Sequence, residues 1–232
     1  MSASLGLTEA ELDGLRQFDS CMVANAVERF RVRLRNTGFT DATVRCMFPE
    51  APPMVGFAAT ARLRCGEPPM SGGTFRDRTD FWNSILEIPS PRILVLQDMD
   101  DPSGRGAFVG DVHAAILKAL GCVGYVTNGA VRELPSVREM GIQAFAGNVA
   151  VSHAYAHIFD VGASISVGGM EVKPGNLLHG DRHGVLTIPT EIAADVSKVA
   201  LALQRTEQKV IDFCRSSSFS VAKLSEVLKT LG

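Results

Sequence analysis

The sequence has few cysteines and no long apolar run. It contains 5 cysteines among 232 residues, and none of them is spaced as C-x-x-C. A scattered, odd set of cysteines favours free thiols in a reducing compartment, so we expect a cytoplasmic protein. No apolar run approaches the roughly 20 residues that cross a bilayer, so we expect no membrane partner. Residues 1–15 contain acids and lack the cationic start of a signal peptide.

An excess of charge of one sign is also absent. Lys and Arg number 23 and Asp and Glu number 25, which gives a formal net charge of -2. A protein that binds nucleic acid needs a basic surface to neutralise phosphates, so we expect no nucleic-acid partner. Hydrophobic residues make up 46% of the chain and charged residues 21%, which excludes a disordered chain and suffices for a full hydrophobic core.

Hydrophobic patterning predicts an α/β fold whose strand–helix core lies between helical ends. Strands are predicted over 55–65, 92–97, 122–127, 142–146, 164–172 and 184–188. Helices are predicted over 8–18, 22–32, 79–87, 111–120, 134–140, 190–214 and 221–231. In the long helix Thr190 is the expected N-cap. Loops are expected over 36–55, 66–78 and 98–110.

One helix of the core starts near charged side chains that follow the next strand. Gly110 allows a sharp turn into a helix that starts at Asp111, where the amides of 111–113 can bind a carboxylate or phosphate. The next strand ends in a turn that delivers Arg132 and Glu133. Ligands of α/β folds gather where strands end and helices begin. A simpler interpretation stays open, in which Asp111 only stabilises the helix through its dipole and the pair of Arg132 and Glu133 is solvated.

The same segment carries a spaced motif. Asp111 and Arg132 are separated by the twenty residues 112–131, and Glu133 follows directly. A second pattern comprises Gly168, Gly169, Pro174, Gly175, Asn176, Asp181, Gly184 and Val185. Both patterns resemble those of the RraA-like family. This family contains the regulator of RNase E activity A and metal-dependent 4-hydroxy-4-methyl-2-oxoglutarate aldolases. The family motif ends in Arg-Asp, so this chain departs from it at Glu133, and Asn176 also replaces the commoner Asp.

The resemblance implies an architecture and an assembly. The fold would be of the swivelling β/β/α type, as a single domain over residues 1–232. Its core would span about 55–190, between N-terminal helices within 1–54 and C-terminal helices within 190–232. The family also implies a homotrimer or homohexamer whose active site lies at a subunit interface.

The resemblance also assigns roles to the motif residues. A substrate carboxylate would be bound at the helix start, by Gly110, Asp111, Val112 and His113. Arg132 would bind the 2-oxo acid, and Asp111 would act beside it in catalysis. Glu133 would hold a divalent cation, Mg²⁺ or Mn²⁺, which prefers oxygen ligands and keeps several waters.

The reaction that the resemblance implies is cleavage of a small 2-oxo dicarboxylic acid, with decarboxylation of oxaloacetate as a side activity. Breaking the carbon–carbon bond leaves a pyruvate enolate, whose charge the cation and Arg132 would stabilise. Both Asp and Glu are hard oxygen donors, so Glu133 is compatible with a cation, but it could instead mark another substrate or a lost activity. The alternative function is a non-catalytic regulator that binds a ribonuclease.

Two further groups are weaker candidates for a metal site. His153 and His157 are four residues apart and could bind zinc on a helix, but no third ligand is evident, which favours a loop or an interface. The three acids within 98–101 could bind a metal, but in a loop with Gly and Ser they are expected to be solvated. His113 could contact substrate or only pack on its helix face.

Overall fold

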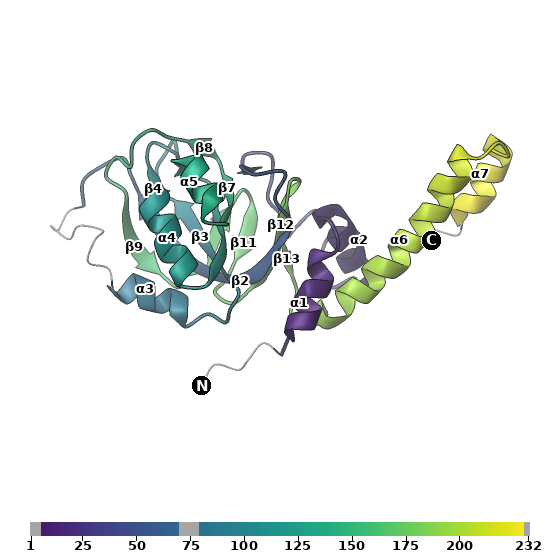
Figure 1. Ribbon diagram of the computed structural model, residues 1–232, viewed down its shortest axis with the longest axis horizontal. Helices are drawn as coiled ribbons and strands as arrows, with labels where there is room; N and C mark the ends of the chain where they lie inside the picture. Colours follow the sequence, from purple (N-terminus) through teal and green to yellow (C-terminus); the bar gives the residue numbers. More distant parts are fainter. Residues whose placement is uncertain (1–5, 70–78, 230–232) are drawn as a thin grey trace.

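The predicted alternation of strands and helices is present in the computed structural model, which describes residues 6–69 and 79–229. A mixed sheet with helices on its faces forms the body of the molecule (Figure 1). This arrangement confirms the predicted α/β class with helical extensions at both ends. Residues 70–78 of one predicted loop, and the last residues of the final predicted helix, lie outside the described ranges.

The main sheet has eight strands, and β2 has three partners in it. In order the strands are β1 (Arg45–Cys46), β7 (Gln143–Ala146), β5 (Cys122–Thr127), β3 (Arg92–Asp98), β2 (Met54–Arg64), β12 (Leu177–Asp181) and β13 (Gly184–Ile188), while β9 (His157–Val161) also pairs with β2. Strands β2, β3, β5 and β7 run parallel to one another. Their continuous apolar runs fit this position, because the strands of a parallel sheet are covered on both faces.

Three short helices cover one face of the parallel strands. They are α3 (Thr79–Leu86), α4 (Asp111–Ala119) and α5 (Leu134–Glu139). Each places apolar side chains three or four residues apart into one core cluster, as Phe81 and Ile85 do from α3 and Ala114 and Leu117 from α4. Burial of these side chains fixes where α4 begins, and therefore where its free amides lie.

The strand predicted over 164–172 is wrong as a single element. It is a hairpin of β10 (Ile165–Val167) and β11 (Met170–Val172). Gly168 and Gly169 have φ of 54° and 72° and turn the chain between the two strands. The hairpin packs its apolar side chains against the opposite face of the sheet.

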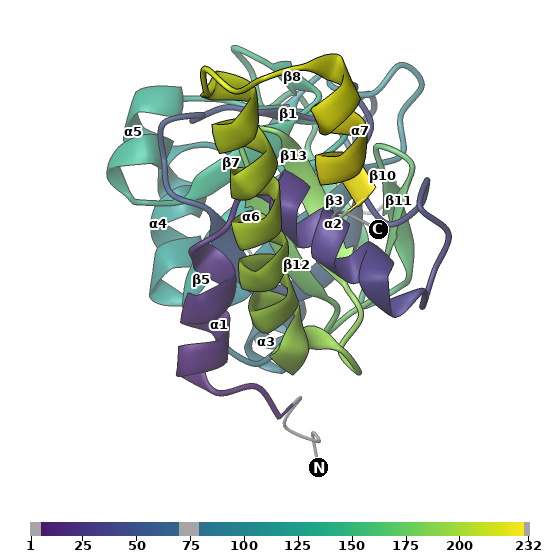
Figure 2. The ribbon, with the colours of Figure 1, turned by 90° about the vertical axis from the view of Figure 1, so that its right-hand side faces the viewer.

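The helical extensions pack together beside β12 and β13. They are α1 (Glu9–Arg16), α2 (Ser20–Phe30) and α6 (Ala193–Arg215) (Figure 2). Ile192 is the N-cap of α6 and makes no side-chain cap bond, so the cap predicted at Thr190 is wrong. The far end of α6 leaves the body and leads to α7 (Val221–Leu228), which buries no residue (Figure 1). Within the described ranges, no helix is long and apolar enough to cross a membrane.

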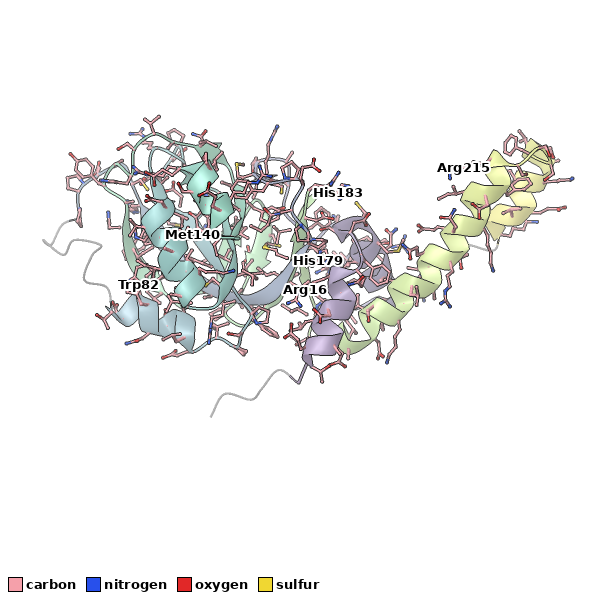
Figure 3. All side chains as sticks on the ribbon, in the orientation of Figure 1. Arg16, Trp82, Met140, His179, His183 and Arg215 are labelled. Atoms are coloured by element: carbon pink, nitrogen blue, oxygen red, sulfur yellow. The ribbon has the colours of Figure 1, made fainter. Side chains whose placement is uncertain are left out.

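A buried polar network joins the N-terminal helices to β12. His179 is fully buried, and its Nε2–H donates to the carbonyl of Phe18 at 3.0 Å. Its Nδ1 lies 3.2 Å from the hydroxyl of Ser20, whose amide donates to the carboxylate of Asp181 at 2.9 Å. Burial lowers the pKa of His179, so the neutral ring can accept from Ser20. Figure 3 shows His179 between the sheet and α2.

Candidate functional site

A small parallel sheet brings the two parts of the spaced motif together. Its strands are β4 (Ala107–Val109), β6 (Ala130–Val131) and β8 (Asn148–Val149). Val109 is opposite Val131, and the amide of Arg132 donates to the carbonyl of Val109 at 3.0 Å. Gly110 and Arg132 therefore follow paired positions, and the interval of twenty residues contains most of α4, then β5, the turn after it and β6. Strands β4 and β6 are too short to be predicted from periodicity.

The helix start that was predicted to bind an anion is occupied by side chains of the chain itself. The amide of Asp111 donates to Glu133 Oε2 at 2.9 Å, and the amide of Val112 donates to Asp111 Oδ1 at 2.6 Å. Both acceptors are carboxylate oxygens, which shows that the positive end of α4 attracts negative charge as expected. A substrate carboxylate can reach these two amides only after Glu133 and Asp111 release them.

Gly110 allows the close approach of Glu133. A Cβ atom at position 110 would lie 2.3 Å from Glu133 Oε2, which is well inside van der Waals contact. The absence of a side chain is therefore required for the observed bond between the Asp111 amide and the carboxylate.

Arg132 and Glu133 form an ion pair beside the helix start. Arg132 Nη2 lies 2.5 Å from Glu133 Oε1, and Nη1 lies 3.5 Å from the carbonyl of Val151. The hydrogen bonds from Arg132 and from the Asp111 amide lower the pKa of Glu133 to about 2, so the carboxylate is charged at neutral pH. Glu133 also has a φ of 53°, a left-handed conformation that costs a non-glycine residue roughly 1–3 kcal/mol. Such strain clusters at functional sites.

All six residues predicted for the site line one cavity of about 480 Å³. They are Gly110, Asp111, Val112, His113, Arg132 and Glu133. The structure thus brings them together, while their individual roles stay predictions. His153, which the sequence analysis considered only for zinc, also lines the cavity. The further lining residues that the sequence analysis missed are Trp82, Ala107, Phe108 and Ile116. Its volume is within the usual range of small-molecule sites, roughly 300–1,000 Å³.

Three rings from three elements line part of this cavity. The ring centroids of Phe108 and His113 lie 4.4 Å apart, and those of Trp82 and His113 lie 5.9 Å apart. Burial, and then the nearby His153 and Arg132, lower the pKa of His113 to about 4, so its ring is neutral at pH 7. Trp82 is on α3, on the side of the body away from α6 (Figure 3). We name Trp82, Phe108 and His113 the aromatic wall.

His153 and His157 do not form the helical pair that a zinc site of this spacing would need. His153 lies in a loop, and His157 is the first residue of β9. Their Nδ1 atoms donate to different carbonyls, of Ala154 at 2.7 Å and of Tyr155 at 2.8 Å. His153 lines the cavity, so the loop position that the sequence favoured brings one of the two histidines to the site.

The acids within 98–101 organise a loop. Asp98 is only 3% exposed, so its expected solvation is wrong. Its carboxylate accepts from the amides of Asp100 and Gly104, and that of Asp100 accepts from the amides of Cys65 and Gly66. The ligand atoms of Cys65, Asp98 and Asp100 lie within 4.8 Å of one another. Burial raises the pKa of Cys65 to about 12, and a protonated thiol is a poor metal ligand.

The carboxylates of Asp111 and Glu133 fit a hard divalent cation better. Both line the cavity, and the two residues are joined by the bond between the Asp111 amide and Glu133 Oε2. Each carboxylate oxygen has two lone pairs, so one hydrogen bond leaves capacity for a cation. Oxygen donors with room for several waters are what Mg²⁺ and Mn²⁺ prefer. The donor types are therefore compatible with such a cation, and the metal site at Glu133 stays a prediction.

Comparison with known proteins confirms the resemblance to the RraA-like family. The sequence profile of the RraA-like family (aldolase/RraA) matches residues 20–187. A Halalkalibacterium halodurans protein, provisionally named a 4-hydroxy-4-methyl-2-oxoglutarate aldolase, is 30% identical over 211 residues, which cover 89% of this chain and 88% of that protein.

Solved structures show the same fold. A protein of uncharacterised function from Pseudomonas syringae has a TM-score of 0.74 at 21% identity, covering 97% of this chain and 95% of its own. Streptomyces coelicolor RraAS2 is described as an unusual member of the RNase ES inhibitor RraA family. Its structure has a TM-score of 0.68 at 19% identity, and the match covers 87% of this chain and 96% of that chain. On the match of its sequence over residues 20–187, the chain belongs to the RraA-like family.

Proposed function

We propose that the protein is a divalent-metal-dependent lyase that cleaves a small 2-oxo acid of the 4-hydroxy-4-methyl-2-oxoglutarate type to pyruvate. Decarboxylation of oxaloacetate, which also leaves a pyruvate enolate, is part of the proposal. The observation that carries it is the joining of Arg132, Glu133 and the start of α4 by hydrogen bonds at one cavity. The name of the Halalkalibacterium halodurans relative supports the same reaction class.

The residues of the cavity would divide the work of substrate binding and charge stabilisation. The guanidinium of Arg132 presents a rigid fork of donors to the substrate's carboxylate and 2-oxo oxygen. Glu133 keeps that fork in place through its bond to Nη2. Rotation of the Glu133 side chain releases the Asp111 amide, which then becomes available to a carboxylate of the substrate.

Aldol cleavage moves charge toward these groups. A base takes the proton from the hydroxyl on carbon 4, and the bond between carbons 3 and 4 breaks as carbon 4 becomes the keto carbon of one pyruvate. The electron pair of the broken bond forms the enolate of a second pyruvate, which then takes up a proton at carbon 3. When bound at the carboxylates of Glu133 and Asp111, Mg²⁺ or Mn²⁺ supplies Lewis-acid stabilisation of negative charge. Arg132 stabilises the same developing charge by hydrogen bonding.

A homotrimer or homohexamer with the site at a subunit interface belongs to the same proposal. Val112 lines the cavity and is 64% exposed, and Val151, whose carbonyl lies near Arg132, is 99% exposed. Apolar side chains this exposed near Arg132 and the start of α4 are suited to contact another subunit. A cytoplasmic location is also proposed, because the five cysteines are all free thiols, as is usual in a reducing compartment.

The decisive experiment measures pyruvate release from 4-hydroxy-4-methyl-2-oxoglutarate and from oxaloacetate, coupled to lactate dehydrogenase. We expect release with Mg²⁺, loss of release with EDTA, and recovery with added Mg²⁺ or Mn²⁺. Arg132→Ala should lower kcat by about 100- to 1,000-fold, as the loss of an oxyanion donor does elsewhere. Arg132→Lys keeps the charge without the fork and should give an intermediate value.

The alternative function is a regulator that binds a ribonuclease, which the description of Streptomyces coelicolor RraAS2 favours. No pyruvate from either compound, from a correctly folded oligomer supplied with metal, would exclude the lyase and leave this alternative. Activity that is indifferent to EDTA would instead exclude the metal from the mechanism.

A further inference from the structure

The lining of the cavity combines two kinds of side chain. The charged groups, Asp111, Arg132 and Glu133, come from the start of α4 and the residues after β6. The aromatic wall and the apolar side chains of Ala107 and Ile116 also line the cavity. A small-molecule site of this kind binds its ligand through a few polar groups and a larger apolar surface.

The three rings of the aromatic wall lie close together, and each pair of rings is tilted. Phe108 and His113 are tilted by 36° at 4.4 Å, and Trp82 lies 5.9 Å from His113 and 6.3 Å from Phe108. Behind them, Phe81 meets Phe108 edge to face at 5.8 Å. Phe108 is 4% exposed and is held by this packing, so the wall is rigid on the side toward the core. A rigid group of rings favours a flat or apolar group.

A second carboxylate placed directly against the aromatic wall would lack a cationic partner of its own. Among the lining residues in the described part of the chain, Arg132 is the single arginine or lysine. It is already paired with Glu133, and the head of the substrate would use it. Placing an anion against rings without a partner costs free energy, because the charged group loses its hydration.

We propose that the aromatic wall is the subsite for the apolar substituent on carbon 4 of the substrate, and that it accepts a flat ring there in preference to a carboxylate. This inference rests on the proposed function, because the 2-oxo acid head must bind at Arg132. In 4-hydroxy-4-methyl-2-oxoglutarate the methyl group on carbon 4 would face the wall. A ring at this position would gain stacking as well as burial.

A matched series of 2-oxo acids tests the subsite without turnover. The compounds 2-oxopentanoate, 2-oxoglutarate and 2-oxo-4-phenylbutanoate share one head and carry methyl, carboxylate or phenyl on carbon 4. None has the 4-hydroxyl that aldol cleavage needs. Binding is read from the fluorescence of Trp82, the only tryptophan of the chain, with Mg²⁺ present. We expect the phenyl compound to bind about tenfold more tightly than 2-oxoglutarate, with the methyl compound between them.

Two variants locate the preference on the wall. Phe108→Leu keeps the fluorescent reporter, and Trp82→Leu is measured by calorimetry. Each should remove most of the advantage of the phenyl compound and leave the affinity for pyruvate unchanged. Phe219→Leu is the matched control, because Phe219 stacks with Phe213 in the C-terminal extension and does not line the cavity. It should leave all affinities unchanged.

The outcomes separate this inference from the proposed function. If 2-oxoglutarate binds as tightly as the phenyl compound, or if both wall variants keep the phenyl advantage, the subsite assignment is wrong while the lyase proposal stands. If Arg132→Ala binds the whole series as well as the unaltered protein, or if no 2-oxo acid binds, the head is not recognised at Arg132. That result overturns the proposed function and the subsite together.

Discussion

Glu133 shows how one side chain joins two segments that are distant along the chain. Its two oxygens contact Arg132 Nη2 and the amide of Asp111. The commoner Asp of the family motif is shorter by one methylene. The extra length gives the carboxylate more reach from a backbone with a φ of 53°. The sequence already showed that Glu133 is an oxygen donor, and the structure adds that its carboxylate lies between Arg132 and the start of α4.

His113 makes stability depend on pH. Its pKa is about 4 in the folded protein, against about 6.5 in an unfolded chain. The unfolded state takes up the proton first, so the contribution of His113 to stability is complete above about pH 6.5 and is lost as the pH falls toward 4. The free energy of unfolding should fall by up to about 1.4 kcal/mol per pH unit in this window.

Urea unfolding between pH 7 and pH 5 measures this dependence. His179, whose pKa burial also lowers, should contribute in the same direction. His113→Phe keeps an aromatic ring and removes the titrating group, so its profile should be shallower than that of the unaltered protein. Parallel profiles for the two proteins would show that His113 does not stay neutral in the folded state.

At the scale of elements, the start of α4 depends on the pairing of β4 with β6. Val109 and Val131 are opposite one another, so the residues that follow them emerge side by side. The loop predicted over 98–110 and the turn before Arg132 gave no sign of this pairing, since strands of two or three residues show no periodicity. The prediction that a helix starts at Asp111 is confirmed.

Gly110→Ala tests the contact at this helix start. The new Cβ would displace the carboxylate of Glu133, which is the far end of a flexible side chain, so the free energy of unfolding should change by less than about 1 kcal/mol. Because Glu133 is the proposed ligand of the cation, displacement of its carboxylate should weaken Mg²⁺ binding by roughly 10- to 100-fold.

Gly66→Ala is the matched control for this variant. A Cβ at Gly66 meets nothing closer than 3.4 Å, so metal binding, activity and stability should all be unchanged. Equal Mg²⁺ affinity in the Gly110→Ala variant and the unaltered protein would show that the position of the Glu133 carboxylate does not matter for the cation.

At the scale of the whole molecule, the C-terminal extension is separable from the body. The N-terminal half of α6 packs on the core with Val196 and Ala200, whereas α7 buries no residue. Figure 2 shows α6 and α7 side by side in front of the sheet, and Figure 1 shows that their far ends lie away from it. The residues that line the cavity do not come from α6 or α7, so we expect its chemistry not to depend on these helices.

Ending the chain at Ser216 should therefore leave the body folded, with a Tm within a few degrees of the full chain at the same protein concentration. Leu15→Ala is the contrasting variant, because Leu15 is fully buried in the cluster that α6 joins. It should cost about 2–5 kcal/mol of unfolding free energy. A truncated chain as unstable as Leu15→Ala would mean that α7 stabilises the fold.

The sequence by itself determined the α/β alternation, the start of α4 and the family motif at Asp111, Arg132 and Glu133. These are local properties, because hydrophobic period, turn residues and spacing are all written along the chain. The buried strand β12 was not predicted, because its hydrogen-bonding partner β2 is distant in sequence. The segment 164–172 was predicted as one strand and is a hairpin.

The tertiary structure alone decided what surrounds the motif. Trp82, Phe108 and His113 come from a helix, a strand and a second helix, and nothing in their spacing predicts that their rings lie close together. It also decided that the amides of α4 are occupied by the carboxylates of Glu133 and Asp111. Such contacts arise only when packing brings separate segments within a few ångströms, which is why the predicted residues could be named from sequence but their surroundings could not.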